Sequence, residues 1–319
     1  MFMLNVIRYV KDHVEEGTLD DLSTPSTFVW VDCYKPTIND LKLLSIKSGI
    51  LIEDLKEALK DNERPKVVDL AGPYSLILFS SPAFKEEEVS TTPVFVYVSK
   101  QHNNVITIRS KNTKSISKIK DSLNSGKGLF DKGSSYFVYR LLDEILTTYF
   151  HVLDDIEETI ENIEKLVYEE PNKRVVENIF NTKKTLIFFH KSLSANREVI
   201  TSIEKEYISD IDKKYAKLFR SLYNDVVQLI DLVGTYRDIL TGALDLYLSS
   251  VSNNLNTVLK KLTALTIIIM IPTFIASVYG MNFKFMPEIS LKYGYVYVWI
   301  LLISSAGLSY LYFKKMEWL

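Results

Sequence analysis

Two long uncharged runs near the C-terminus constrain this chain more than any other feature. No charged residue occurs in residues 262–283, a run of 22, or in residues 293–313, a run of 21. A helix rises 1.5 Å per residue, so each run spans roughly 30 Å, the thickness of a bilayer core. A pair of buried core helices is the alternative, but two such runs in succession are rare in soluble folds. The sequence therefore predicts two transmembrane helices, at 262–282 and 293–313.

The lysines beside these runs indicate their orientation. Lys260 and Lys261 precede the first run and Lys314 and Lys315 follow the second, whereas the connection 284–292 carries two lysines and one glutamate. Cytoplasmic flanks of membrane helices carry an excess of basic residues. We therefore expect a multi-pass protein of the cell membrane, in contact with lipid, with both termini in the cytoplasm.

The composition excludes several classes of function. The 38 basic and 40 acidic residues give a net charge of −2, which excludes a strongly basic nucleic-acid binder. The single cysteine, Cys33, excludes an internal disulfide and a cysteine-based zinc cluster. The four histidines lie far apart, and no glycine-rich nucleotide motif or nucleophile elbow occurs. We expect neither an enzyme nor an organic cofactor.

Strand and helix signals alternate in residues 1–132, which predicts an α/β layer domain. Runs rich in β-formers occupy 4–9, 27–32, 74–80, 94–99 and 104–109, and helical patterns occupy 37–47, 51–61 and 113–123.

Long helices follow in residues 133–261. Apolar residues recur at steps of three and four until Pro171, and a second helix is expected at 173–205. A third begins near Asp210 and, if unbroken to Tyr279, spans 70 residues or roughly 105 Å, too long for one small domain. The predicted fold class is therefore α+β/α. It comprises a cytoplasmic α/β domain (1–132), a long-helix stalk (133–261) and a transmembrane domain (262–319).

The first membrane run is not uniformly apolar. A stripe with three hydroxyls and a thioether follows steps of 3, 4, 4, 3 and 4, which place its members on one helix face. They are Leu259, Leu262, Thr266, Met270, Thr273 and Ser277, with Ile267, Ile268, Ile271, Phe274, Ile275 and Val278 assigned to the other face. Such a stripe indicates either helix–helix packing or the lining of a pore.

The chemistry of these runs favours a hydrated divalent cation over a proton relay. Neither run contains the carboxylate that a proton pump would place there. Mg²⁺ dehydrates reluctantly, so a ring of neutral oxygens can hold it through its waters. Two helices per chain cannot enclose an aqueous path, so a pore requires several subunits around an axis.

The sequence YGMNF at 279–283, followed by Met286-Pro287-Glu288, carries a family resemblance. With the two terminal runs and the basic end at Lys314-Lys315, it resembles the CorA family of magnesium transporters, whose signature is Gly-Met-Asn at the outer end of the first of two C-terminal membrane helices. The resemblance covers the whole chain in architecture and residues 235–319 in close residue pattern. It implies a homopentamer with an α/β cytoplasmic domain, a funnel of long helices and a pore lined by the first membrane helix.

The resemblance also implies site residues. Gly280, Met281 and Asn282 match the selectivity site for the hydrated ion, where glycine would let the backbone turn and the Asn282 amide oxygen would accept from coordinated water. Leu259, Leu262 and Met270 would close the path by excluding water. The implied pore-lining positions are Asp245, Asn256, Leu259, Leu262, Met270, Thr273 and Ser277, with Glu288 in the outer loop and a basic ring at Lys314 and Lys315.

Magnesium sensing between neighbouring cytoplasmic domains is a further implication, and here the chain departs from the family pattern. The stalk position expected to hold the sensor aspartate is Ser221, and Asp225 lies one turn further along. The partner region on the α/β domain holds Glu86, Glu87 and Glu88. We take Glu88 and Asp225 as the candidate regulatory ligands.

These features predict a passive Mg²⁺ uptake channel, gated by intracellular Mg²⁺ and driven by the membrane potential, with Co²⁺ and Ni²⁺ open as further substrates. One alternative is a Zn²⁺ or Co²⁺ transporter on the same scaffold, although neutral oxygen suits hydrated Mg²⁺ better than zinc. Another is a membrane-tethered signalling protein with an α/β sensor head, which would need neither the polar stripe nor Gly-Met-Asn.

Overall fold

A computed structural model describes residues 3–10, 13–24, 27–60, 63–85, 88–124, 130–169, 172–205, 211–284 and 286–319. The chain divides into two compact units. The first comprises residues 1–165 and 173–242, and the second comprises residues 166–172 and 243–319.

A seven-stranded sheet lies at the centre of the first unit, in the order β2-β1-β3-β7-β6-β5-β4. Neighbouring strands are antiparallel except for β3 and β7, which pair in parallel with Val29 opposite Asn104 and Tyr34 opposite Arg109. The strands are β1 (Met3–Val10), β2 (His13–Glu16), β3 (Phe28–Tyr34), β4 (Lys66–Asp69), β5 (Tyr74–Lys85), β6 (Glu88–Ser99) and β7 (Asn104–Arg109).

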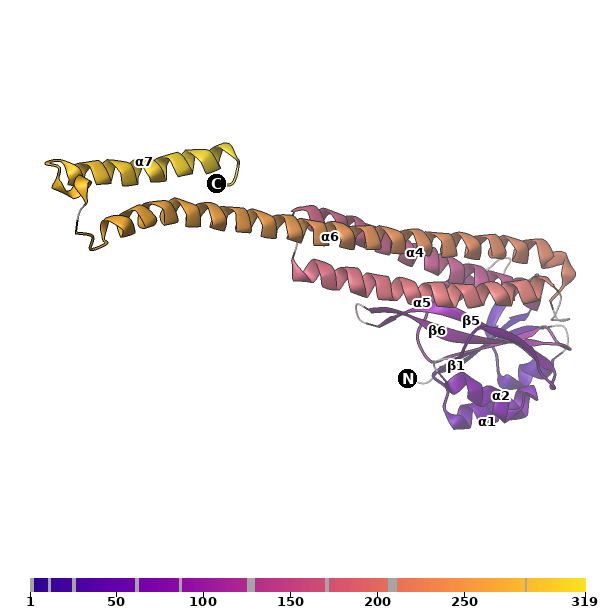
Figure 1. The fold of residues 1–319 in the computed structure, drawn as a ribbon. Coiled ribbons are helices and arrows are strands. Elements are labelled where there is room, and N and C mark those ends of the chain that lie inside the picture. Colours follow the sequence, from indigo (N-terminus) through magenta and orange to yellow (C-terminus); the bar gives the residue numbers. More distant parts are fainter. Residues whose placement is uncertain are drawn as a thin grey trace. The chain divides into compact units, whose positions relative to one another are not determined.

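Helices cover both faces of this sheet, as Figure 1 shows. Alternate residues of β3 face opposite layers. Val29 and Val31 join the core beneath α1 and α2, whereas the Trp30 ring packs against Phe137 of α4 at 4.9 Å. The α/β layer domain predicted from the sequence is therefore confirmed. The helices of these layers are α1 (Ile38–Ser48), α2 (Ile52–Lys56), α3 (Lys114–Asn124), α4 (Ser134–Glu169) and α5 (Lys173–Glu204), with short 3-10 helices η1 (Leu19–Ser23) and η2 (Glu57–Leu59).

A buried charge cluster fixes the parallel strand pair to α3. Asp32, which is 1% exposed, accepts hydrogen bonds from Thr107 Oγ1 at 2.9 Å and Arg109 Nη2 at 2.8 Å. Lys120 of α3 forms an ion pair with the same carboxylate at 2.6 Å. Buried charges require such partners, so these groups serve the stability of the α/β layer.

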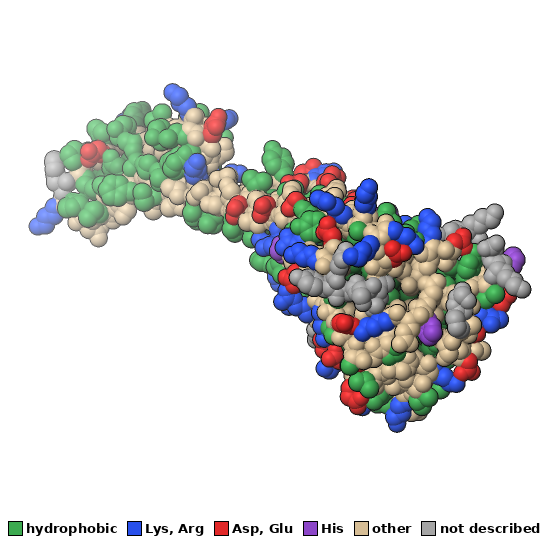
Figure 2. Space-filling model, turned by 90° about the vertical axis from the view of Figure 1, so that its right-hand side faces the viewer, with side chains coloured by type: hydrophobic (Ala, Val, Ile, Leu, Met, Phe, Trp, Pro, Cys, Tyr) green, Lys and Arg blue, Asp and Glu red, His purple; other side chains and the backbone are tan. Residues whose placement is uncertain are grey.

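The remaining helices carry the chain to its C-terminus. The short η3 (Lys213–Tyr215) precedes α6 (Ala216–Tyr279), which contains Pro272 and runs for 64 residues. After η4 (Pro287–Ser290), α7 (Gly294–Lys315) completes the fold. By length and composition α6 and α7 can each cross a membrane, and only 6% of either apolar window is buried. Figure 2 shows hydrophobic side chains crowding the surface of the second unit.

Candidate functional site

Within the second unit, α7 covers one face of α6. Ala264 is fully buried, and Ile268, Ile271 and Ile275 are half-buried. Ile271 of α6 lines a shared groove with residues of α7, among them Phe313. A small residue such as Ala264 lets two membrane helices approach closely. This face of α6 is therefore the one that lies against α7.

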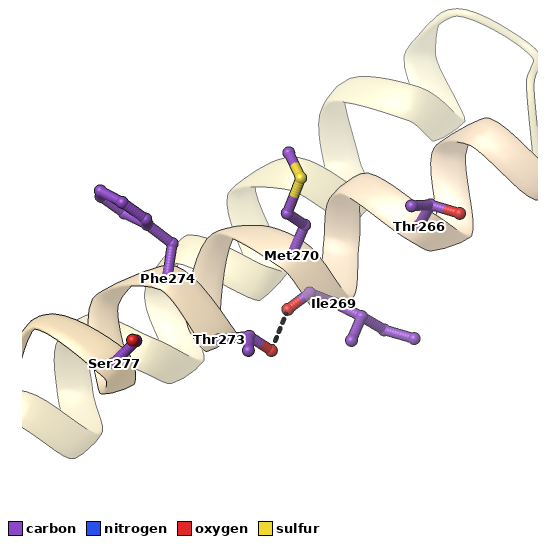
Figure 3. Close-up of a pocket in the computed structure, with 6 residues that line it drawn as sticks. All are labelled: Thr266, Ile269, Met270, Thr273, Phe274 and Ser277. Atoms are coloured by element: carbon purple, nitrogen blue, oxygen red, sulfur yellow. Dashed lines mark hydrogen bonds between the residues drawn. The ribbon is translucent and has the colours of Figure 1, made fainter. Parts of the chain in front are cut away.

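A groove of about 560 Å³ follows the opposite face of α6, as Figure 3 shows. Met270, at its centre, is 56% exposed. Phe274, which the sequence pattern assigns to the other face, also lines the groove and is 69% exposed. It lies only about 60° from Ser277 around the helix axis, which explains this difference. The full lining is Thr266, Ile269, Met270, Thr273, Phe274 and Ser277.

The threonine hydroxyls in this groove are held as hydrogen-bond acceptors. Thr266 Oγ1 donates to the carbonyl of Leu262 at 2.8 Å. Thr273 Oγ1 donates to the carbonyl of Ile269 at 2.8 Å, the bond drawn as a dashed line in Figure 3. Each hydroxyl has one hydrogen, so its oxygen is left with lone pairs only. Waters bound to a cation point their hydrogens outward and need such acceptors. The groove can thus receive a hydrated cation without any charged side chain.

Helix α6 ends immediately before Gly280. The Gly280 N–H bonds to the carbonyls of Ala276 at 3.0 Å and Ser277 at 3.1 Å, and Met281 N–H bonds to Val278 at 3.2 Å. Met281 and Asn282 are exposed beyond this end. The φ of Gly280 is not left-handed, and an added Cβ would come no closer than 3.4 Å to any atom. Within the single chain, neither the backbone conformation nor the space at position 280 demands a glycine.

The connection between α6 and α7 is packed against the start of α7. Glu288, predicted to face the outside, is half-exposed within η4. A Cβ added to Gly294 would lie 2.2 Å from the Glu288 carbonyl oxygen, so only glycine fits this contact. The position of Glu288 thus depends on the absence of a side chain at Gly294.

Gly294→Ala is therefore expected to destabilise the connection between α6 and α7, because overpacking of this kind costs about 1–3 kcal/mol. Gly307→Ala is the matched control in the same helix, since a Cβ there meets nothing within 4 Å. Thermal unfolding of the full chain in detergent measures both. Equal melting temperatures for the two variants would contradict the close contact at Gly294.

The other predicted pore positions are exposed along α6 and at the end of α7. Leu259 is 50% and Leu262 is 58% exposed, and Asp245, Lys314 and Lys315 are exposed as well. Leu259 and Leu262 continue the groove face toward the N-terminal end of the apolar run. The groove itself contains Thr266, Met270, Thr273 and Ser277 of the stripe, whereas Leu259 lines a different groove.

A second groove, which sequence reasoning missed, lies beside this stripe. Its volume is about 420 Å³, and it brings the C-terminal Trp318 against α6 next to Asn256. The lining is Asn253, Asn256, Thr257, Leu259, Lys260, Thr263 and Trp318.

The candidate regulatory residues belong to the first unit. Burial raises the pKa of Asp225 on α6. Burial also raises the pKa of Asp143 on α4; the charge of Arg140 opposes this rise, and the charge of Asp225 adds to it. Glu88 is the first residue of β6, but its side chain and the predicted partners Glu86 and Glu87 lie outside the described residues. In the described part of the chain, no three His, Cys, Asp or Glu residues are grouped to hold a metal.

Comparison with known proteins decides the family. The family profile described as CorA-like Mg²⁺ transporter protein matches residues 25–315. The chain belongs to the CorA family. The cobalt/magnesium transport protein CorA of Methanocaldococcus jannaschii is 33% identical to it, over 99% of this chain and 100% of that protein. The cobalt/magnesium transport protein CorA of Thermotoga maritima is 34% identical over 83% of this chain and 76% of that protein.

The CorA fold extends over the whole chain. The complete structure of the CorA magnesium transporter from Methanocaldococcus jannaschii superposes with a TM-score of 0.89 at 30% identity and covers all of both chains. The predicted combination of a soluble α/β domain, a long helix and two candidate C-terminal membrane helices is therefore confirmed.

Proposed function

We propose that this CorA chain forms a homopentameric channel that takes up divalent cations, with Mg²⁺ as the main ion. The observation that carries the proposal is the division of α6 into two faces. One face is covered by α7, and the other presents uncharged oxygens that lead to Gly280, Met281 and Asn282. A groove on a single helix encloses nothing, so several copies around an axis are needed to complete the path.

Each proposed role in the path follows from the chemistry of the residue. Asn282, with Gly280 and Met281, selects the hydrated ion at the outer mouth, and Glu288 belongs to the same outer connection. The groove face conducts, and its apolar members close the path when water is excluded. The lining is Asp245, Asn256, Leu259, Leu262, Met270, Thr273 and Ser277, with Lys314 and Lys315 as a basic ring at the cytoplasmic end.

The donor chemistry favours Mg²⁺ over Zn²⁺. Zinc prefers thiolate and imidazole ligands, and the sequence contains no cysteine after Cys33 and no histidine after His190. Co²⁺ is a second candidate substrate, since two similar proteins are named cobalt/magnesium transport proteins. A membrane-tethered sensor protein is the alternative from another class of function. A sensor of this kind gives the oxygen-bearing face of α6 no role.

The membrane potential supplies the driving force in this proposal. With both termini in the cytoplasm and the outer loop outside, two positive charges moving inward gain about 4.6 kcal/mol at 100 mV. The three parts of the chain then act as a cytoplasmic domain (1–132), a stalk (133–261) and a pore domain (262–319).

Ion flux into liposomes that contain the purified protein tests the proposal. With an inside-negative potential, we expect Mg²⁺ uptake that grows with the potential, and slower or equal uptake of Co²⁺. Absence of uptake for both ions would overturn the channel assignment, and uptake of Zn²⁺ alone would favour the zinc transporter.

Intracellular Mg²⁺ is proposed to close the channel through carboxylates of neighbouring cytoplasmic domains. Burial already disfavours the charged form of Asp225, and its charge acts on the neighbouring Asp143, so a carboxylate there gains from a nearby cation. A divalent ion shared between two subunits converts repulsion into a bridge. Glu88 and Asp225 are the candidate ligands, and the stalk helices would transmit the loss of the ion to Leu259 and Leu262.

Mg²⁺ is therefore expected to protect the cytoplasmic domain of the wild type against limited proteolysis at millimolar concentrations. The double variant Glu88→Ala/Asp225→Ala should lose most of this protection. A matched control is Asp20→Ala, an exposed carboxylate that pairs with Lys47 on the same chain. Equal protection of the wild type and the double variant would show that these two residues are not the sensor.

A further inference from the structure

The C-terminal end of α7 has an unusual cap. Trp318 N–H bonds to the Phe313 carbonyl at 3.1 Å, and Glu317 N–H bonds to the Lys314 carbonyl at 3.2 Å. Together these two bonds form a Schellman motif, in which the residue just after the helix cap adopts a left-handed conformation. That residue is Glu317, with φ of 59°. Most such positions hold glycine, because a side chain disfavours this conformation.

Aromatic packing accompanies this strained cap. The Trp318 ring stacks on Phe313 with centroids 5.5 Å apart and an interplanar angle of 30°. Phe313 is 6% exposed and Trp318 is half-buried. A residue in a disfavoured backbone conformation persists when its surroundings determine it. The packing of Trp318 thus provides a reason for the left-handed Glu317.

The place where Trp318 meets α6 adjoins the stripe of the proposed pore. Its groove includes Asn256, Leu259 and Thr263. Around the helix axis Asn256 and Thr263 lie about 60° and 40° from Leu259, on the side toward the face that α7 covers. Trp318 therefore occupies the flank of α6 between its groove face and its α7 face. In a ring with the groove faces inward, this flank turns toward the neighbouring subunit.

We propose that Trp318 is a positioning residue for the gate. Its ring fills the flank groove beside Leu259 and fixes the cytoplasmic ends of α6 and α7 to one another. Leu259 is then held toward the axis, and α6 can rotate or tilt to open the path only when Trp318 shifts in its groove. The proposal rests on the channel function proposed above and adds a residue outside the pore lining to it.

Flux measurements on tail variants test this role. Trp318→Ala is expected to leave flux without internal Mg²⁺ unchanged, but to retain several-fold more flux than the wild type at millimolar internal Mg²⁺. Trp318→Phe keeps the stack on Phe313 and should restore most of the closure. Trp299→Ala is the matched control, because it removes a half-exposed tryptophan of α7, the helix that precedes Trp318, from a position outside the groove.

A labelling experiment separates this proposal from the channel proposal. Leu259→Cys is introduced into the wild-type and Trp318→Ala chains, and the native Cys33, which is 1% exposed, stays unreactive. Maleimide labelling from the cytoplasmic side should be several-fold faster without Trp318. Equal labelling rates, or normal Mg²⁺ closure in an assembled Trp318→Ala channel, would overturn the positioning role. Absence of flux in the wild type would overturn the channel proposal instead, and the labelling rates would still show whether Trp318 covers Leu259.

Discussion

Replacing Asn282 with alanine is expected to nearly abolish Mg²⁺ flux while the oligomer still assembles. Asn282 is exposed just beyond the end of α6, at the proposed outer mouth. Its amide oxygen is an acceptor for ion-bound water, and alanine offers none. One hydrogen bond to a charged group contributes about 1.5–3 kcal/mol, and 1.4 kcal/mol is a factor of ten. Loss of one acceptor from every subunit should therefore lower flux by more than tenfold.

The control for this prediction is Asn254→Ala, which removes an exposed asparagine of α6 from outside the groove face. Proteoliposome flux and size-exclusion chromatography are measured for both variants. Asn254→Ala should behave as the wild type. Normal flux in Asn282→Ala would show that selection occurs elsewhere.

Placing a hydroxyl in the proposed gate is the change with the second largest expected effect. Leu259 and Met270 are 50% and 56% exposed in the single chain, and both belong to the stripe that includes Thr266 and Thr273. A ring of such side chains closes a path by excluding water, and a hydroxyl lowers the cost of filling the constriction. Leu259→Ser and Met270→Ser are therefore expected to raise flux severalfold at high internal Mg²⁺.

Ile303→Ser provides the comparison, since Ile303 of α7 is 65% exposed and lines neither groove of α6. It should leave the Mg²⁺ dependence of flux unchanged. If neither Leu259→Ser nor Met270→Ser alters flux at high Mg²⁺, the constriction is formed by other residues.

The sequence predicts elements well where hydrophobic periodicity is strong. Five of the seven described strands and the long helices α4 to α7 follow from such patterns. The strand β2 was missed because all four of its side chains are exposed, so no alternation marks it. The four residues of β4 are likewise exposed or half-buried. The predicted start of α6 near Asp210 lies outside the described residues, and the helix begins at Ala216.

Strand order could not be predicted, because it depends on pairing between distant segments. The parallel pair β3–β7 joins residues about 75 positions apart, for which the sequence carries no local signal.

The candidate site also contains features that local sequence predicts and features that it does not. The stripe on α6 could be predicted because helical spacing alone assigns residues to a face. The groove at Trp318 could not, because it requires a chain reversal at Glu317, and glutamate is not a residue that signals a left-handed turn. Contacts between subunits lie beyond a single chain, which is why the ligands of the regulatory site stay a prediction.

Substituted cysteines on two faces of α6 test the central claim, that its oxygen-bearing face lines the ion path. The native Cys33 is not expected to react with the thiol reagent, because it is buried and burial raises the pKa of its thiol. Thr273→Cys lies in the groove, whereas Ile271→Cys faces α7. A membrane-impermeant thiol reagent should block Mg²⁺ flux through the Thr273→Cys channel and leave the Ile271→Cys channel conducting. Block of the Ile271→Cys channel with an unaffected Thr273→Cys channel would contradict the account.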